Sequence, residues 1–130
     1  ILRYAQKTAI AERRTVCVTI AGTCPTDATR NSVTATIFTK NPATASCTGA
    51  VVVACSKTPV ADGEVCALQL PFAPACGQGI SGTLPGSPPV PIPSFQFAAL
   101  GSTDQNAAIT VDITNSTPIT IEAATGYVHD

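Results

Sequence analysis

Two hydrophobic periodicities meet in the stretch Ile1-Leu-Arg-Tyr-Ala-Gln-Lys-Thr-Ala-Ile-Ala-Glu-Arg-Arg-Thr-Val-Cys-Val-Thr-Ile20. Residues with good helix propensity fill positions 1–14. From Thr15 the period changes to two, so that Val16, Val18 and Ile20 point to one side of a strand. The stretch therefore predicts a helix over 1–14 that runs directly into a strand. No Ser, Thr, Asp or Asn stands before Ile1 as an N-cap, and we therefore expect the helix to continue from an upstream segment.

The composition indicates one β-rich domain over residues 1–130, with the helix at 1–14 and strands in 15–130. Apolar residues make up 45% of the chain, which is too many for a disordered segment. Charged residues make up only 12%, and the net charge is −1. This balance gives no basic footprint for nucleic acid.

Six cysteines predict disulfides in an oxidising compartment, because an even count in a small Thr- and Pro-rich chain is typical of that setting. The sequence leaves their pairing open, and the nearby pair Cys17 and Cys24 is the first candidate. A metal site is disfavoured, because the chain has no C-x-x-C motif and its single histidine, His129, lies near the C-terminus. The six cysteines are Cys17, Cys24, Cys47, Cys55, Cys66 and Cys76.

Further strands are predicted by alternation and by turn residues. We expect strands at 32–38, 65–70, 95–98, 108–114 and 119–123, with a final edge pair at 127–128. The turns between them are expected at 21–27, 59–63 and 115–118, and Asp62-Gly63 is the hairpin signal. The apolar run 50–54 indicates a central strand covered on both faces.

The segment 71–93 is dense in Pro and Gly, which disfavours regular sheet. We expect a long extended loop pinned at Cys76. It serves either as a stiff crossover between sheets or as a Pro-rich surface for a partner. Together the elements predict an α+β fold in which an N-terminal α-helix packs on a disulfide-stapled antiparallel β-sandwich.

Two motifs stand at the ends of the chain. The first follows the pattern L-x-Y-A-Q-x-x-A-I-A-x-x-R before a V-C-V strand; the second runs from a phenylalanine strand through a Gly turn and paired strands to E-x-x-T-G-Y-V. Together they resemble the GspH/FimT family of minor pseudopilins and minor pilins. The matching positions are Leu2, Tyr4, Ala5, Gln6, Ala9, Ile10, Ala11, Arg13, Arg14, 16–18, 95–101, 109–113, 119–121 and 122–128.

The resemblance implies a non-enzymatic subunit of a type IV pilus or a type II secretion pseudopilus that helps to initiate fibre assembly near the tip. It implies a location in the bacterial cell envelope, with an inner-membrane anchor through a missing N-terminal helix and a periplasmic or extracellular position in the fibre. The implied partners are other pilin or pseudopilin subunits. Small residues on the helix allow close approach to such a neighbour. The candidate interface residues are Leu2, Tyr4, Ala5, Ala9 and Ala11.

Alternatives stay open beside this interpretation. The apolar stripe of the helix consists of Ile1, Ala5, Thr8 and Ala9, with Leu2 and Val16 nearby, and it most simply packs on the domain's own sheet. A DNA-binding minor pilin is the second functional hypothesis, although residues 58–130 contain no Lys or Arg to meet phosphates. An unrelated secreted, disulfide-rich adhesin is the third. We predict no catalytic residue, cofactor or metal, because the histidine and the few carboxylates form no recognisable catalytic pattern.

Overall fold

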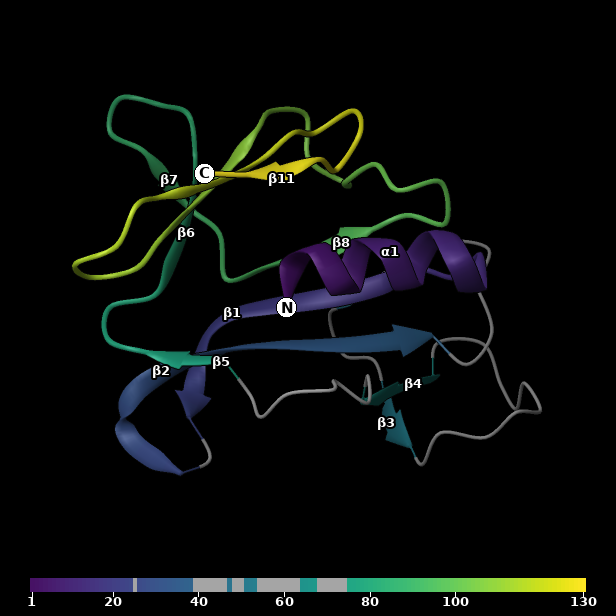
Figure 1. The fold of residues 1–130 in the computed structure, drawn as a ribbon, viewed down its shortest axis with the longest axis horizontal. Coiled ribbons are helices and arrows are strands. Elements are labelled where there is room, and N and C mark those ends of the chain that lie inside the picture. Colours follow the sequence, from purple (N-terminus) through teal and green to yellow (C-terminus); the bar gives the residue numbers. More distant parts are fainter. Residues whose placement is uncertain (25, 39–46, 48–50, 54–63, 68–74) are drawn as a thin grey trace.

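A computed structural model describes residues 1–24, 26–38, 47, 51–53, 64–67 and 75–130 (Figure 1). In these ranges the chain forms one helix, α1 (Leu2–Glu12), and eleven strands. The strands are β1 (Val16–Cys24), β2 (Asp27–Phe38), β3 (Val51–Val53), β4 (Glu64–Ala67), β5 (Ala75–Gly77), β6 (Ser81–Leu84), β7 (Val90–Pro91), β8 (Ser94–Phe97), β9 (Ile109–Asp112), β10 (Ile119–Ile121) and β11 (Val128–His129). Within this part of the chain, no helix is long and apolar enough to cross a membrane.

The helix ends two residues earlier than predicted because Arg13 adopts the left-handed conformation, with φ of 52°. The backbone N–H of Arg13 donates to the carbonyl of Ile10 at 3.3 Å, and that of Arg14 donates to Ala9 at 3.1 Å. This pair of bonds closes the last turn in the manner of a Schellman motif, in which glycine is the usual residue. At the other end, Ile1 makes no side-chain capping bond.

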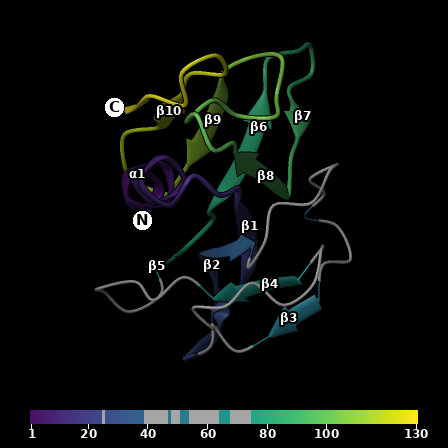
Figure 2. The same cartoon turned by 90° about the vertical axis from the view of Figure 1, so that its right-hand side faces the viewer.

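The helix buries one side against the two sheets. Leu2, Ala5 and Ala9 are the buried residues of α1 and belong to the main apolar core. The two alanines have no exposed surface at all, so the helix backbone lies close to the strands below it. Figure 1 shows α1 running alongside β1 next to β8, and Figure 2 shows the helix end-on at one side of the molecule.

The first sheet has the order β3-β4-β2-β1-β8, and β5 pairs with the far end of β2. Strands β1 and β2 are antiparallel, with Val16 opposite Ile37 and Val18 opposite Ala35. The predicted alternation is confirmed, because 16, 18 and 20 of β1 and 33, 35 and 37 of β2 all lie in the main core. Cys17 projects to the other face of the sheet, where it packs with Phe38 and Val65.

The second sheet has the order β11-β10-β9-β6-β7, and its strand pairs are antiparallel. Its buried residues share the main core with the first sheet and α1. Phe95 and Phe97 of β8 add an edge-to-face pair, with ring centroids 5.2 Å apart. The α+β class with a helix on largely antiparallel sheets is therefore confirmed. The apolar residues that the second sheet contributes include Ile109, Val111, Ile121 and Val128.

One prediction about the middle of the chain is wrong. Strand β3 stands at the end of the strand order, not at its centre, and it pairs with β4 in parallel. The hairpin signal at Asp62-Gly63 stays a prediction. Those two residues lie outside the described part of the chain. An apolar run without alternation fixes neither the neighbours nor the direction of a strand, which is why the sequence misled here.

The segment 71–93 is also more regular than predicted, since it contains β5, β6 and β7. Strands β5 and β6 form in the window 75–84, which contains no proline. Pro91 does lie in a strand, but β7 has two residues and ends the order of its sheet. An edge strand tolerates the missing N–H of proline. The predicted pinning at Cys76 is confirmed, because this residue is disulfide-bonded.

Candidate interaction surface

The disulfides hold the first sheet together. Cys17 is bonded to Cys47 and Cys24 to Cys76, and in both pairs the Cα atoms are 5.7 Å apart. Cys66 is disulfide-bonded as well, whereas Cys55 lies outside the described residues. The second bond ties the tip of the β1–β2 hairpin to β5 across 52 residues of sequence. The predicted disulfide framework is confirmed for the cysteines that the structure describes.

The pairing of Cys17 with Cys24 is wrong. Both cysteines lie on β1, because the turn expected from residue 21 begins only after residue 24. Seven strand positions separate them, which is roughly 23 Å at about 3.3 Å per residue. A disulfide requires Cα atoms about 4.4–6.8 Å apart, so the two ends of one strand cannot be joined.

The five candidate interface residues divide into two groups. Leu2, Ala5 and Ala9 are 5%, 0% and 0% exposed, and they contact the domain's own core. A neighbouring subunit cannot reach these three side chains in this fold, so their assignment to a subunit interface is corrected. Tyr4 is 39% exposed, and Ala11 is also exposed. For these two residues the interface role stays a prediction.

The solvent-facing side of α1 forms a narrow band. Tyr4, Lys7 and Ala11 stand at the i, i+3 and i+7 positions, which lie above one another on a helix, and all three are exposed. We call these three residues the helix band. Ile10, which is 47% exposed, flanks it near the C-terminal end of α1. The small side chain of Ala11 leaves room for another backbone to approach at this end.

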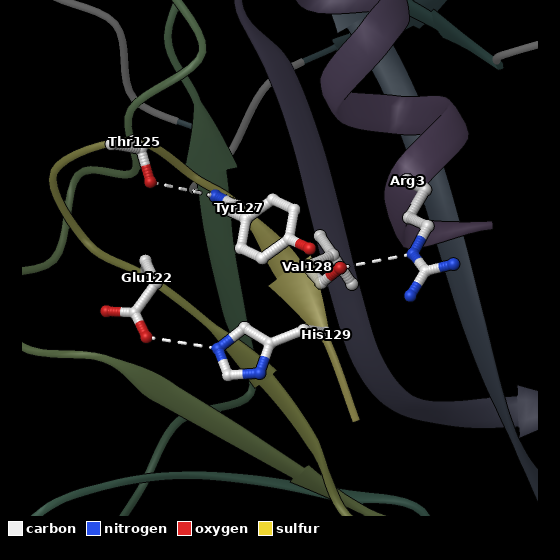
Figure 3. Close-up of polar contacts among 6 residues, drawn as sticks. All are labelled: Arg3, Glu122, Thr125, Tyr127, Val128 and His129. Atoms are coloured by element: carbon white, nitrogen blue, oxygen red, sulfur yellow. Dashed lines mark hydrogen bonds and ion pairs between the residues drawn. The ribbon is translucent and has the colours of Figure 1, made fainter.

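The other flank of α1 is fastened to residues 122–130, which we call the C-terminal segment. The Nε of Arg3 donates to the carbonyl of Val128 at 3.1 Å, and the Nε2 of Gln6 donates to the carbonyl of Thr125 at 2.9 Å. Figure 3 shows the Arg3 bond beside the last strand. These bonds join residues 125 and 119 positions apart in sequence. The two ends of the chain therefore form one continuous surface.

Short contacts order the C-terminal segment itself. The Nε2 of His129 lies 3.1 Å from Oε1 of Glu122, and the ring of Tyr127 stacks on the imidazole with centroids 5.3 Å apart. The backbone N–H of Tyr127 donates to the hydroxyl of Thr125 at 3.2 Å (Figure 3). The only histidine of the sequence is thus engaged with a carboxylate and an aromatic ring at the surface. Sequence reasoning identified the motif but missed that it contacts α1.

An apolar pocket of about 470 Å³ opens where the first turn of α1 meets the second sheet. Its apolar walls come from the helix, from β2 and from the segments around β6, β9, β10 and β11. Arg3, His129 and Asp130 contribute polar atoms, and a guanidinium nitrogen of Arg3 lies 3.6 Å from a carboxylate oxygen of Asp130. Ser116 and Thr117 supply hydroxyl groups. The apolar residues of the pocket are Ile1, Leu2, Val33, Ile80, Val111, Ile113, Ile119 and Val128.

In the part of the chain that the structure describes, the carboxyl of Asp27 has a perturbed pKa. The hydroxyl and the backbone N–H of Thr29 both donate to Oδ1 of Asp27, at 2.7 and 3.0 Å, and lower the pKa of that carboxyl, with a smaller contribution from Arg30. This arrangement stabilises the start of β2 and is typical of a turn. Among the described residues, His, Cys, Asp and Glu form no group of three that could hold a metal ion.

Comparison with known proteins gives no relative for this chain: no protein-family model, no curated protein and no solved structure matches it.

Proposed function

We propose that this domain is a non-enzymatic structural subunit of a pilus-like fibre, of the minor pilin or minor pseudopilin type. It would act in a type IV pilus or a type II secretion pseudopilus, near the tip, where it helps to initiate assembly. Its partners would be other pilin or pseudopilin subunits. The sequence features that suggest this role are the two end motifs that resemble the GspH/FimT family.

One observation carries the proposal. The two motifs come from opposite ends of the sequence, yet they lie against each other, with Arg3 bonded to Val128 and Gln6 bonded to Thr125. Gln6, Thr125 and Val128 are themselves motif positions. A chance similarity in either end alone would not explain why motif residues of both ends contact one another. The contact supports an interpretation in which both motifs serve a single structural unit.

The helix band suggests where a neighbouring subunit binds. Leu2, Ala5 and Ala9 pack into the domain's own core, whereas Tyr4, Lys7 and Ala11, with Ile10 beside them, are exposed, as are Arg3 and Glu12. A helix that offers a short residue between larger ones suits close packing against a second helix. We propose this band as the inter-subunit contact, in place of the buried stripe.

The proposed location is the bacterial cell envelope, with an inner-membrane anchor through a helix upstream of Ile1 and a periplasmic or extracellular domain. The disulfides Cys17–Cys47 and Cys24–Cys76 support an oxidising compartment, because such bonds are rare in the cytosol.

Site-specific photocross-linking in cells tests the proposal. A photoreactive residue replaces Ala11 in the helix band, or Ala28 as a matched control, since Ala28 is also exposed but lies at the start of β2. We expect products with pilin or pseudopilin subunits from position 11 and none from position 28. Deletion of the gene should reduce surface fibres or secretion through the type II system. Equal cross-linking from both positions, with unchanged fibres and secretion after deletion, would reject the proposal.

DNA binding stays the alternative for a domain of this type. All seven Lys and Arg residues lie in the first 57 positions, and Arg3 is already paired with Asp130. A mobility shift with low-micromolar protein at physiological salt would promote this alternative. We expect none, because phosphate contacts supply most of the affinity for DNA.

A further inference from the structure

The hairpin between β9 and β10 carries a sequence motif that the proposed function does not use. Asn115-Ser-Thr117 fits the pattern N-x-S/T, in which x is not proline, and this pattern marks asparagines that accept N-linked glycans. The sequence contains four asparagines, and only Asn115 has Ser or Thr two positions later. Because the motif is short, the case for a modification site depends on where the fold places it.

The motif lies at the exposed tip of this hairpin. Residues 114–118 are all exposed, and they fall between the end of β9 at Asp112 and the start of β10 at Ile119. In Figure 1 the tip is the yellow-green loop at the left edge of the molecule. An enzyme that carries a bulky sugar donor can therefore reach the motif from solvent.

The backbone turns at Asn115. The N–H of Ser116 donates to the carbonyl of Ile113 at 3.0 Å, which makes Asn115 the third residue of a four-residue turn. The φ of Asn115 is 63°, and asparagine is one of the few residues that adopt this conformation readily. Its side-chain amide makes no hydrogen bond to any residue that the structure describes. The amide nitrogen is therefore available to an enzyme.

Thr117 supplies the second half of the motif. The turn explains an asparagine at position 115, but it places no demand on position 117. Thr117 is exposed, and within the described ranges its hydroxyl makes no hydrogen bond. The fold thus leaves both functional groups of the motif, the amide and the hydroxyl, open to a modifying enzyme.

The tip can change shape without disturbing the sheets. The hairpin is anchored at Thr114, whose N–H donates to the carbonyl of Gln78 at 3.1 Å. Beyond that residue, the bond from Ser116 to Ile113 is the one backbone hydrogen bond that closes the tip in the described chain. Pro118 favours an extended conformation at the residue before it. An enzyme that requires an extended acceptor therefore has little structure to open.

We propose that Asn115 accepts an N-linked glycan from a lipid-phosphate-linked sugar donor. The amide nitrogen attacks the anomeric carbon of the donor sugar, and a C–N bond forms. The bond from that carbon to the phosphate oxygen breaks, the lipid phosphate leaves with the electron pair, and one amide proton passes to the transferase. The disulfides Cys17–Cys47 and Cys24–Cys76 fit this chemistry, because both features are typical of chains that leave the cytosol.

The proposal goes beyond the proposed function, since it concerns a surface other than the helix band. Its failure would leave the cross-linking test unaffected.

Mass spectrometry of the chain purified from the cells that naturally produce it tests the proposal. Cleavage before aspartate gives peptide 112–129, in which Asn115 is the sole asparagine, and peptide 104–111, which contains the exposed Asn106. We expect the mass of a glycan on peptide 112–129 and none on peptide 104–111. An amidase that releases N-linked glycans should remove this mass and convert Asn115 to aspartate.

Substitutions show whether the motif directs the modification. Thr117→Ala should abolish it, whereas Thr117→Ser should keep it, because serine retains the hydroxyl. Asn115→Gln should also abolish it, and Asn106→Gln is the matched control that leaves it unchanged. The two Thr117 variants keep the left-handed residue of the turn, so they separate loss of the motif from a disturbed hairpin. An unmodified peptide 112–129 in the wild-type chain would overturn the proposal, and so would a glycan that survives in Asn115→Gln or Thr117→Ala.

Discussion

The guanidinium of Arg3 donates through Nε to the carbonyl of Val128 at 3.1 Å, which joins the first turn of α1 to the last strand across 125 residues. The same side chain also approaches Asp130 at 3.6 Å, where both groups are well exposed. The two contacts differ in kind. The first satisfies a backbone acceptor on the outer side of β11, whereas the second is a surface ion pair that solvent screens.

We therefore expect Arg3→Ala to lower the free energy of unfolding by about 1 kcal/mol, chiefly through the lost bond to Val128. Asp130→Asn removes only the ion pair and should cost at most about 0.5 kcal/mol. Chemical denaturation of both variants, followed by circular dichroism, measures the difference. An equal cost for the two substitutions would mean that the ion pair, and not the backbone bond, fastens the C-terminal segment.

The disulfide pairing predicts a specific tryptic pattern. Cleavage at Lys and Arg places Cys17 and Cys24 together on peptide 15–30, Cys47 on 41–57 and Cys76 on 58–130. Because Cys17 bonds Cys47 and Cys24 bonds Cys76, the unreduced digest should contain one species in which all three peptides are linked. Mass spectrometry before and after reduction reads this directly. A free peptide 15–30 with an internal disulfide would contradict the structure.

Removal of the Cys24–Cys76 bond should also destabilise the domain. The double substitution of both cysteines by Ser opens a loop of 52 residues, for which chain entropy predicts a loss of about 4 kcal/mol. The expected readout is a lower midpoint in urea. A matched double substitution at Cys17 and Cys47 opens a loop of 30 residues and should cost about as much, since the dependence on loop length is weak.

The sequence was informative where a residue's surroundings follow from local periodicity. Alternation correctly assigned 16, 18 and 20 of β1 and 33, 35 and 37 of β2 to the core, because a strand has only two faces. The helical period predicted a stripe of Ile1, Ala5, Thr8 and Ala9, with Leu2 nearby, that packs on the domain's own sheet. Of these residues, Leu2, Ala5 and Ala9 are buried in the core. The helix end at Arg13 was missed, because arginine is a good helix former and rarely takes the left-handed conformation.

Features that depend on how distant segments meet could not be read from the sequence. The pairing of Cys24 with Cys76 depends on β5 lying against β2, which no local pattern indicates. The parallel pairing of β3 and β4 is of the same kind. Both ends of the chain contribute to the contact between Arg3 and Val128 and to the pocket beside it. The sequence showed each motif separately, but it did not show that the two motifs contact each other.

Substitutions at two alanines of α1 distinguish an effect on folding from an effect on fibre assembly. Ala9 has no exposed surface, so Ala9→Leu should overpack the core and cost about 1–3 kcal/mol. Ala11 is exposed, so Ala11→Leu should change stability by less than about 0.5 kcal/mol. Thermal melts of the purified chain measure both. In cells, the second variant at normal protein level should reduce fibre assembly if the helix band is an interface, although its fold is intact.

Gly126 is hard to replace, because its backbone lies directly against the turn that contains Gly101. Its φ is +63°, and a Cβ there would collide with the carbonyl oxygen of Gly101 and come within 3.0 Å of the Phe97 ring. Gly126→Ala should therefore cost more than about 2 kcal/mol, since steric overlap adds to the left-handed conformation. Asn115→Ala is the control, because Asn115 has a φ of 63° but is exposed. The control should cost about 1 kcal/mol. Similar melting temperatures for the two variants would show that the turns separate easily.

The lowered pKa of Asp27 predicts how the β1–β2 hairpin responds to acid. Its cause is the pair of hydrogen bonds from Thr29, with Arg30 nearby. A carboxyl whose folded pKa lies below its unfolded value stabilises the fold fully above the unfolded value. That contribution is lost as the pH falls through the folded pKa.

Thr29→Val removes the hydroxyl donor, so the pKa of Asp27 should rise toward its ordinary value, and the acid sensitivity of the hairpin should diminish. Titration of the Asp27 carboxyl carbon by NMR in both chains measures the change. A Thr29→Ser control should keep the lowered pKa, and a rise in this variant as large as in Thr29→Val would show that the hydroxyl bond is not its cause.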